Sequence, residues 1–323
     1  MNKPKILVTR RWPAAVEAKL DELFDPVFNG EDIPLSIDQI RSAMDDFDAI
    51  LPTVTDQIGA AAFNGRAPRT KIIGNYGVGF SHIDTAAAAE RKIVVTNTPD
   101  VLSECTADIA IMLMLMAARR AGEGERELRA GVWTGWRPTH LIGQKLSGKT
   151  LGVVGFGRIG QETARRAHFG FGMPIIVQSR STVPQAVLNA FGARQVDTLD
   201  ELMAQSDVVS LHCPGGEINK HLIGAQQLSA MKPNGILINT ARGEVVDEEA
   251  LATALEVGQI AGAGLDVFDG EPRIHQGLLE SPNTVLLPHL GSATRETREA
   301  MGFRVIDNLV AFFDGREPAD RVA

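Results

Sequence analysis

The sequence predicts two α/β domains, each built around a doubly wound parallel sheet. Short, continuously apolar runs alternate with amphipathic stretches along most of the 323 residues, and such runs are typical of strands that are covered on both faces. The series occurs twice: residues 48–55 and 72–84 have counterparts in residues 207–214 and 236–247. A chain of this length commonly forms about two domains.

The first series of strands begins near the N-terminus. Its apolar runs are residues 5–9 (KILVT), 49–51 (AIL), 71–74 (KIIG) and 93–96 (IVVT), with an amphipathic helical stretch at 13–23. A helical apolar pattern also occupies residues 294–313, after the last strand of the second series. We expect this last helix to return to the first domain, which would then be discontinuous in sequence.

A long helix at residues 104–125 separates the two series, and a loop at 131–149 follows it. The second series consists of the runs 151–155 (LGVVG), 174–177 (PIIV), 208–212 (VVSLH), 235–239 (GILIN), 262–266 (GAGLD) and 285–287 (VLL). Ligands of open α/β sheets bind outside the carboxyl ends of the strands. The turns after these runs are therefore the expected sites.

Composition excludes several classes of function. The formal net charge is −8 and no basic run is present, which argues against a nucleic-acid partner. Cys105 and Cys213 are too far apart in sequence for a metal or redox pair. The longest apolar stretch, residues 109–118, is shorter than the roughly 20 residues that span a bilayer. Without a signal-peptide pattern, we expect a soluble, cytoplasmic protein with no metal site and no membrane association.

One glycine pattern predicts a dinucleotide site. After the run 151–154 and before a helical stretch stands the complete G-x-G-x-x-G sequence Gly155-Phe156-Gly157-Arg158-Ile159-Gly160. The first glycine permits a tight turn, the second lets a pyrophosphate approach, and the third lets the helix pack on the strand. The N-terminus of that helix attracts phosphate. A glycine-rich connection without a ligand is the alternative.

The acidic residue usual at such a site is missing. It commonly lies about 20 residues further on and binds the ribose 2′-hydroxyl of NAD, but here that region reads Ser179-Arg180-Ser181. An acid would repel the 2′-phosphate of NADP, whereas an arginine can bind it. We therefore predict that NADP(H) is preferred over NAD(H). The alternative is that Arg180 is a solvated surface residue and that both cofactors are accepted.

Candidate catalytic residues stand in turns after predicted strands. Arg242, in TARG, could bind a carboxylate bidentately or form a surface ion pair with Glu244 or Asp247. His289, in PHLGS, suits proton transfer near neutral pH but could be structural. The acidic turn at 266–272 (DVFDGEP) could orient a base or be a solvated loop. In residues 74–79 (GNYGVG), backbone N–H groups could form an anion-binding nest or only a tight turn.

Six motifs in the same order give the chain a marked resemblance to a known family. They are NYGVGFSHID, VTNTPDVLSECTADIA, GKTLGVVGFGRIG, INTARGEVVDEEAL, GLDVFDGEP and LPHLGSAT. The chain resembles the D-isomer-specific 2-hydroxyacid dehydrogenases, most of all the glyoxylate and hydroxypyruvate reductases. The resemblance implies a Rossmann cofactor domain at residues 100–290 and a flavodoxin-like substrate domain formed by residues 1–99 and 291–323.

The resemblance also implies roles for individual residues. Arg242 would bind the substrate carboxylate and polarise the ketone, Glu271 would keep the histidine protonated, and His289 would protonate the carbonyl oxygen. The N–H groups of Val78 and Gly79 would contact the substrate carboxylate. Asp266 would face the nicotinamide carboxamide. Further cofactor contacts are implied for Thr106, His212, Cys213, Pro214, Thr240, Ala241 and Gly291.

The implied reaction is the NADPH-dependent reduction of glyoxylate or hydroxypyruvate to glycolate or D-glycerate. Bulkier 2-oxo acids such as phenylpyruvate are an alternative, and so is a dinucleotide-sensing corepressor, although no long tail carries partner motifs. Residues 51–55 (LPTVT) contain no arginine for a substrate phosphate, which disfavours phosphoglycerate.

A homodimer is predicted from the apolar positions of the helix at 104–125. These positions cover more than one face of the helix: Ile109, Met112, Leu113, Leu115 and Met116. By the resemblance, Trp133 or Trp136 would reach the partner's active site.

Overall fold

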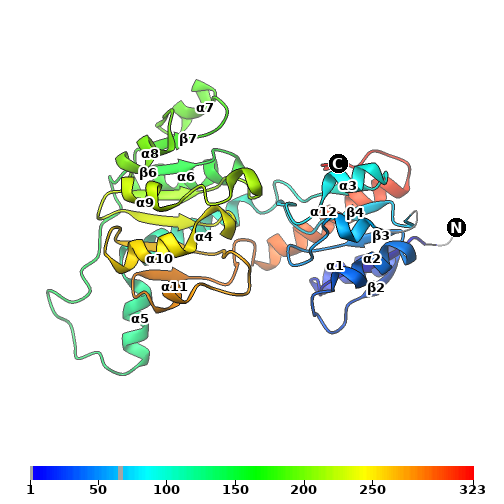
Figure 1. Ribbon diagram of the computed structural model, residues 1–323, viewed down its shortest axis with the longest axis horizontal. Coiled ribbons are helices and arrows are strands. Elements are labelled where there is room, and N and C mark those ends of the chain that lie inside the picture. Colours follow the sequence, from blue (N-terminus) through cyan, green and yellow to red (C-terminus); the bar gives the residue numbers. More distant parts are fainter. Residues whose placement is uncertain (1–2, 65–67) are drawn as a thin grey trace. The chain divides into compact units, whose positions relative to one another are not determined.

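The computed structural model describes residues 3–64 and 68–323, and the chain divides into two compact units (Figure 1). Unit 1 consists of Met1–Leu102 and Ala293–Ala323, and unit 2 of Ser103–Ser292. Each unit is built on its own parallel sheet.

The sheet of unit 1 has five strands in the order β2-β1-β3-β4-β5, which is the flavodoxin order. All its strand pairs are parallel. The strands are β1 (Lys5–Val8), β2 (Asp25–Phe28), β3 (Ala49–Leu51), β4 (Ile72–Gly74) and β5 (Val94–Thr96).

Helices cover both faces of this sheet. One face carries α2 (Ile37–Asp46), the short helix η1 (Ala60–Phe63) and α3 (Thr85–Glu90), which enclose a core with Ile50, Ile73 and Val95. The other carries α1 (Ala14–Leu23) and α12 (Arg295–Phe313). The C-terminal helix packs on β4 because Gly74 has no side chain: a Cβ there would lie 2.8 Å from Val305 Cγ1.

The sheet of unit 2 has seven strands in the order β12-β11-β10-β9-β6-β7-β8. All its pairs are parallel. Along the sheet, the six strands β8-β7-β6-β9-β10-β11 have the order of a dinucleotide-binding fold. The strands are β6 (Leu151–Val154), β7 (Ile175–Gln178), β8 (Ala193–Gln195), β9 (Val208–Leu211), β10 (Ile236–Asn239), β11 (Gly262–Leu265) and β12 (Thr284–Leu286).

Two separate cores lie on the two faces of this sheet. One is closed by α8 (Leu199–Gln205), α9 (Ala225–Ala230), α10 (Glu248–Glu256) and α11 (Gln276–Glu280). The other is closed by α4 (Ser103–Ala118), α6 (Arg158–Phe171) and α7 (Gln185–Ala190). The prediction of two doubly wound parallel α/β sheets is therefore confirmed.

The prediction of one long helix at residues 104–125 is wrong. This stretch is divided into α4 and α5 (Ala121–Arg129) because Arg120 adopts a left-handed conformation with φ 52°. Short helical turns also follow β9 (η2, Glu217–Asn219) and β10 (η3, Gly243–Val245). Within residues 3–64 and 68–323, none of the helices has the length and apolar character needed to cross a membrane.

Candidate active site

The glycine turn after β6 leaves space where the sequence predicts a pyrophosphate. Gly155 has φ 87°, and a Cβ on it would lie 2.7 Å from the backbone nitrogen of Cys213. At Gly160 a Cβ would lie 2.3 Å from the Gly155 carbonyl oxygen, so only glycine lets α6 approach the strand. A Cβ on Gly157, by contrast, would meet nothing within 4 Å. Gly157 precedes α6 without a side-chain cap, so the turn offers an open approach to a helix N-terminus.

The rest of the glycine motif anchors this turn. Phe156 is buried and packs edge-on against Phe191, with ring centroids 5.6 Å apart. Arg158 and Ile159 form the first turn of α6.

The loop after β7 carries the residues that replace the missing acid. Ser179 is half-buried, whereas Arg180 and Ser181 are exposed. The carbonyl of Gln178, just before them, accepts a hydrogen bond from the N–H of Gly155 (2.9 Å). The two loops that would contact the adenosine side of a dinucleotide are thus joined directly.

The loop after β9 lies against the glycine turn and contains His212, Cys213 and Pro214. Ser210 Oγ lies 2.8 Å from His212 Nε2, and burial lowers the pKa of His212 to about 3. Burial likewise raises the pKa of Cys213 to about 11, with the charge of Arg180 acting in the opposite direction. Both side chains are therefore uncharged near neutral pH.

The turn after β10 is shaped by Asn239, the last residue of the strand. Its Oδ1 accepts from the N–H of Ala241 (3.0 Å), and its Nδ2 donates to the carbonyl of Arg242 (2.9 Å). Thr240 and Ala241 are buried in this turn. The Arg242 side chain donates from Nη1 to the Ala241 carbonyl (2.7 Å).

Arg242 keeps its charge in a confined position. Burial lowers its pKa, while the carboxylates of Glu244 and Glu271 act to raise it, and an arginine remains protonated in either case. A Cβ on Gly215 would lie 2.8 Å from Arg242 Cγ, so the loop after β9 limits where the side chain can turn. The site therefore holds a permanent cation at the carboxyl end of β10.

The turns after β10 and β11 are in direct backbone contact. A Cβ on Gly243 would lie 1.8 Å from the carbonyl carbon of Phe268 and 2.2 Å from the nitrogen of Asp269. Only glycine fits there. This contact brings the loop with Arg242 next to the loop that carries Glu271.

Glu271 and His289 form a hydrogen-bonded pair across the turns after β11 and β12. Glu271 Oε2 lies 2.9 Å from His289 Nδ1, and Glu271 Oε1 accepts from the N–H of Phe268 (3.0 Å). Burial would raise the pKa of the Glu271 carboxyl, but its bonds to His289 and Phe268 and the charge of Arg242 hold that pKa below its usual value. An ionised Glu271 thus faces Nδ1, and Nε2 is the ring nitrogen that Glu271 does not contact.

Asp266 fixes the turn that carries this histidine. Its carbonyl accepts from the N–H of His289 (2.9 Å), Oδ1 from Leu290 (2.6 Å) and Oδ2 from Gly291 (2.7 Å). Thr106 Oγ1 donates to the Gly291 carbonyl (3.0 Å) from α4. These four bonds hold His289 in the left-handed region, with φ 55°, which is uncommon for a residue other than glycine. We call this arrangement the His289 clamp.

In unit 1, the loop that contains Val78 and Gly79 has its carbonyl groups held by two asparagines. Asn75 Nδ2 donates to the carbonyls of Gly77 (3.0 Å) and Gly79 (3.1 Å), and Asn97 Nδ2 donates to that of Val78 (2.8 Å). The N–H groups of Val78 and Gly79 make no hydrogen bond within the described residues. Adjacent backbone N–H groups without an acceptor in the protein suit the binding of an anion.

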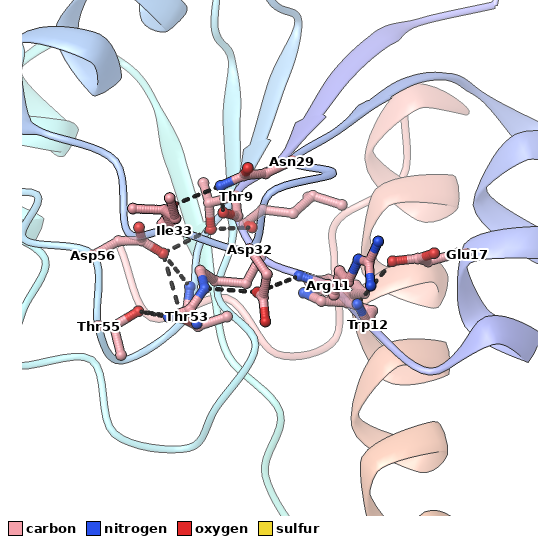
Figure 2. Close-up of polar contacts among 12 residues, drawn as sticks. Thr9, Arg11, Trp12, Glu17, Asn29, Asp32, Ile33, Thr53, Thr55 and Asp56 are labelled. Carbon is pink, nitrogen blue, oxygen red and sulfur yellow. Dashed lines mark hydrogen bonds and ion pairs between the residues drawn. The ribbon is translucent and has the colours of Figure 1, made fainter.

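The loop after β3 lies on the same sheet edge and is organised by a buried acid (Figure 2). Asp56 Oδ2 accepts from Thr9 Oγ1 (2.6 Å) and from the N–H of Thr53 (2.8 Å). Residues 51–55 contain no arginine, but Arg10 donates to Thr55 Oγ1 (2.9 Å) while its Nε is paired with Asp32 (2.9 Å). The loop therefore has an arginine beside it that the sequence did not reveal.

Sequence reasoning missed the residues that shape the turns. Asn239 stands at a strand end, where an Asn side chain commonly bonds the following backbone, so it could have been found. Glu244 accepts from the N–H of Gly216 (3.1 Å) and Glu248 from that of Asp269 (2.8 Å). These contacts join segments distant in sequence and carry no local signal.

Known proteins with similar sequences show the family of the chain. Residues 111–291 match the family model described as D-isomer specific 2-hydroxyacid dehydrogenase, NAD binding domain. Glyoxylate reductase of Thermococcus litoralis is 44% identical, with 99% of this chain and 97% of that protein aligned. Glycerate dehydrogenase of Hyphomicrobium methylovorum is 38% identical over 98% of each chain.

Solved structures give the same result. The NADPH-dependent glyoxylate/hydroxypyruvate reductase of Sinorhizobium meliloti, in complex with NADP and malonate, superposes with a TM-score of 0.88 at 38% identity, covering 100% of this chain and 97% of that one. With these similarities along nearly its whole length, the chain belongs to the D-isomer-specific 2-hydroxyacid dehydrogenase family.

Proposed function

We propose that this protein reduces glyoxylate or hydroxypyruvate to the corresponding 2-hydroxy acid, with NADPH as the preferred reductant. The observation that carries the proposal is the Glu271–His289 pair beside Arg242, at the carboxyl ends of adjacent strands. The named relatives, which are glyoxylate reductases and a glycerate dehydrogenase, support this substrate class.

The residues of unit 2 suit a dinucleotide. The space over Gly157 and the N-terminus of α6 would take the pyrophosphate, and the loop at Ser179–Ser181 would lie by the adenosine ribose. His212, Cys213 and Pro214 would line the adenosine side, and Thr106, Thr240, Ala241, Asp266 and Gly291 the other parts of the cofactor. When bound, the cofactor supplies the hydride that reduces the carbonyl carbon.

The protein groups perform the remaining chemistry. Arg242 binds the substrate carboxylate and polarises the carbonyl. In unit 1, the N–H groups of Val78 and Gly79 suit an anion in their own right. His289 donates the proton on Nε2 to the carbonyl oxygen as negative charge develops there. Glu271 accepts from Nδ1 and stabilises the imidazolium before transfer. The His289 side chain is 30% exposed, so solvent can restore its proton.

A panel of 2-oxo acids tests the proposal. Glyoxylate, hydroxypyruvate, pyruvate and phenylpyruvate are each assayed with NADPH and with NADH, and kcat/KM is compared. We expect the first two acids with NADPH to give the highest values. A higher value for phenylpyruvate would assign the enzyme to bulkier acids, and no turnover of any acid would refute the proposed reaction.

We also propose a homodimer that forms through α4, α5 and the segment after them. Leu113 of α4 is fully buried, but Met112 and Leu115 are each 36% exposed. Leu128, Val132, Trp133, Trp136 and Ile142 are also exposed, a surplus of apolar surface that a second copy would cover. Sedimentation equilibrium should give twice the chain mass. A monomer at all concentrations would contradict this assembly.

A further inference from the structure

The side-chain amide of Gln195 forms hydrogen bonds, through both its nitrogen and its oxygen, to the backbone of a single loop. It is the last residue of the edge strand β8 and pairs in register with Val177 of β7. Its Nε2 donates to the carbonyls of Ser179 (3.3 Å) and Ser181 (3.1 Å), and its Oε1 accepts from the N–H of Val183 (2.8 Å). An amide has two N–H donors and one carbonyl acceptor, so each of its groups is used.

The segment held in this way is the loop at residues 179–183. Arg180, Ser181 and Thr182 are exposed, so packing alone fixes little of the loop. Its two ends are secured, since β7 precedes it and Val183 packs against the apolar core. Between those ends, Gln195 holds the backbone from both sides of Arg180.

We propose that Gln195 is a positioning residue for cofactor selectivity. By fixing the backbone of 179–183, it holds Ser179 and Arg180 in place to bind the 2′-phosphate of NADPH. The inference rests on the NADPH preference proposed above. Both N–H donors of Gln195 are used by the loop, so it has no donor left for a phosphate and acts through the loop.

The effect should be selective for the phosphorylated cofactor. Ser179 and Arg180 lie where the adenosine ribose is expected, whereas the pyrophosphate and the nicotinamide are assigned to other turns. A loop that must become ordered on binding lowers affinity by the cost of that ordering. Loss of Gln195 should therefore weaken binding of the 2′-phosphate and leave the other contacts unchanged.

Fragment binding tests this without catalysis. Isothermal titration measures the Kd of 2′,5′-ADP, which carries the 2′-phosphate, and of 5′-AMP, which lacks it. In Gln195→Leu the affinity for 2′,5′-ADP should fall by about tenfold, a typical cost of lost preorganisation, while 5′-AMP binding and kcat with NADH stay within about twofold. Gln195→Thr gives a second variant, because threonine suits a strand but is too short to reach the loop.

Gln205→Leu is the matched control. Gln205 is also half-buried, but it donates to Glu201 (2.9 Å) within α8 and accepts from the Arg194 side chain of β8, and it makes no bond to the loop. Its removal should leave the ratio of the two Kd values unchanged. In an Arg180→Ala, Ser179→Ala background, Gln195→Leu should have little further effect, since the groups that it positions are gone.

The outcomes separate the inference from the proposed function. If unmodified protein prefers 2′,5′-ADP and Gln195→Leu keeps that preference, the inference is wrong and the cofactor assignment stands. If Gln195→Leu weakened the binding of 2′,5′-ADP and of 5′-AMP equally, Gln195 would have a general structural role and the inference would be wrong. The inference would also be wrong if Gln195→Leu had its full effect in the double-substituted background. If unmodified protein binds both fragments equally, the NADPH preference and the inference fail together, while reduction of 2-oxo acids is judged by the substrate panel.

Discussion

The His289 clamp gives a sharp prediction, because one substitution alters it at a single atom. In Asp266→Asn the side chain keeps its shape, but one carboxylate oxygen becomes an NH2 group. That group would face the N–H of Leu290 or Gly291, each of which now donates to a carboxylate oxygen at 2.6–2.7 Å. One backbone donor therefore loses its acceptor at a position where Asp266 is only 1% exposed.

The size of the effect follows from these contacts. A hydrogen bond to a charged group contributes about 1.5–3 kcal/mol, and the left-handed conformation of His289 costs about 1–2 kcal/mol that the clamp offsets. Loss of about 2–3 kcal/mol lowers the melting temperature of a unit of this size by roughly 5–10 °C. Release of the turn displaces His289, and a misplacement of about 1 Å can reduce the rate about 10²-fold.

The assay measures kcat/KM, the cofactor Kd and the melting temperature together. We expect Asp266→Asn to lower kcat/KM about 10²-fold, as a displaced acid would, and to weaken NADPH binding by a smaller factor, since Asp266 is also proposed to line the cofactor. Thr106→Val, which removes the donor to Gly291, should have a smaller effect of the same kind, and Thr106→Ser should restore activity. Near-normal kcat/KM in Asp266→Asn would refute the positioning argument. A loss confined to the cofactor Kd would show that Asp266 acts on the cofactor alone and does not position His289.

Three further predictions concern single side chains. His289→Gln should lower kcat/KM by about 10²–10⁴-fold without changing the NADPH Kd; near-full activity at neutral pH would remove His289 as the proton donor. Glu271→Gln tests the pairing through stability. The lowered pKa of Glu271 means that its stabilisation is complete above its unfolded pKa, roughly 4.3, and is lost as pH falls through the lower folded value. The unfolding free energy should therefore fall more between pH 5 and pH 3 in unmodified protein than in the variant. The same fall in both proteins would contradict the pairing. Arg180→Ala should weaken NADPH binding at least about tenfold, or ~1.4 kcal/mol, and Ser179→Asp should reverse the preference; equal kcat/KM for NADH and NADPH in unmodified protein would argue against both.

The strands with continuous apolar runs could be predicted, including the edge strands β5 and β12, but β2 and β8 could not. The run at residues 151–154 became β6 because a strand covered on both faces is apolar at every position. The edge strands β2 (DPVF) and β8 (ARQ) carry polar residues where their side chains are exposed, so neither shows a continuous apolar run. The break at Arg120 was also missed, because a left-handed residue does not alter the apolar pattern around it.

The candidate site divides in the same way. Glycine spacing and the positions of Arg242, Glu271 and His289 after strands are local features, so the sequence was sufficient to select them as candidates. Gln195, Thr106 and Arg10 act on loops that lie 14, 185 and 45 positions away in sequence. Only the fold brings such groups together.

The contact of Gly243 with the Phe268–Asp269 peptide has a consequence for enzyme engineering. Any side chain at position 243 would displace the peptide that leads to Glu271, so a saturation library at this position should yield no active clones. A graft of the Arg242 turn into another scaffold would fail for the same reason unless residues 266–271 were transferred with it. The two turns form a single transplantable module, and recombination crossovers should be placed outside residues 239–271.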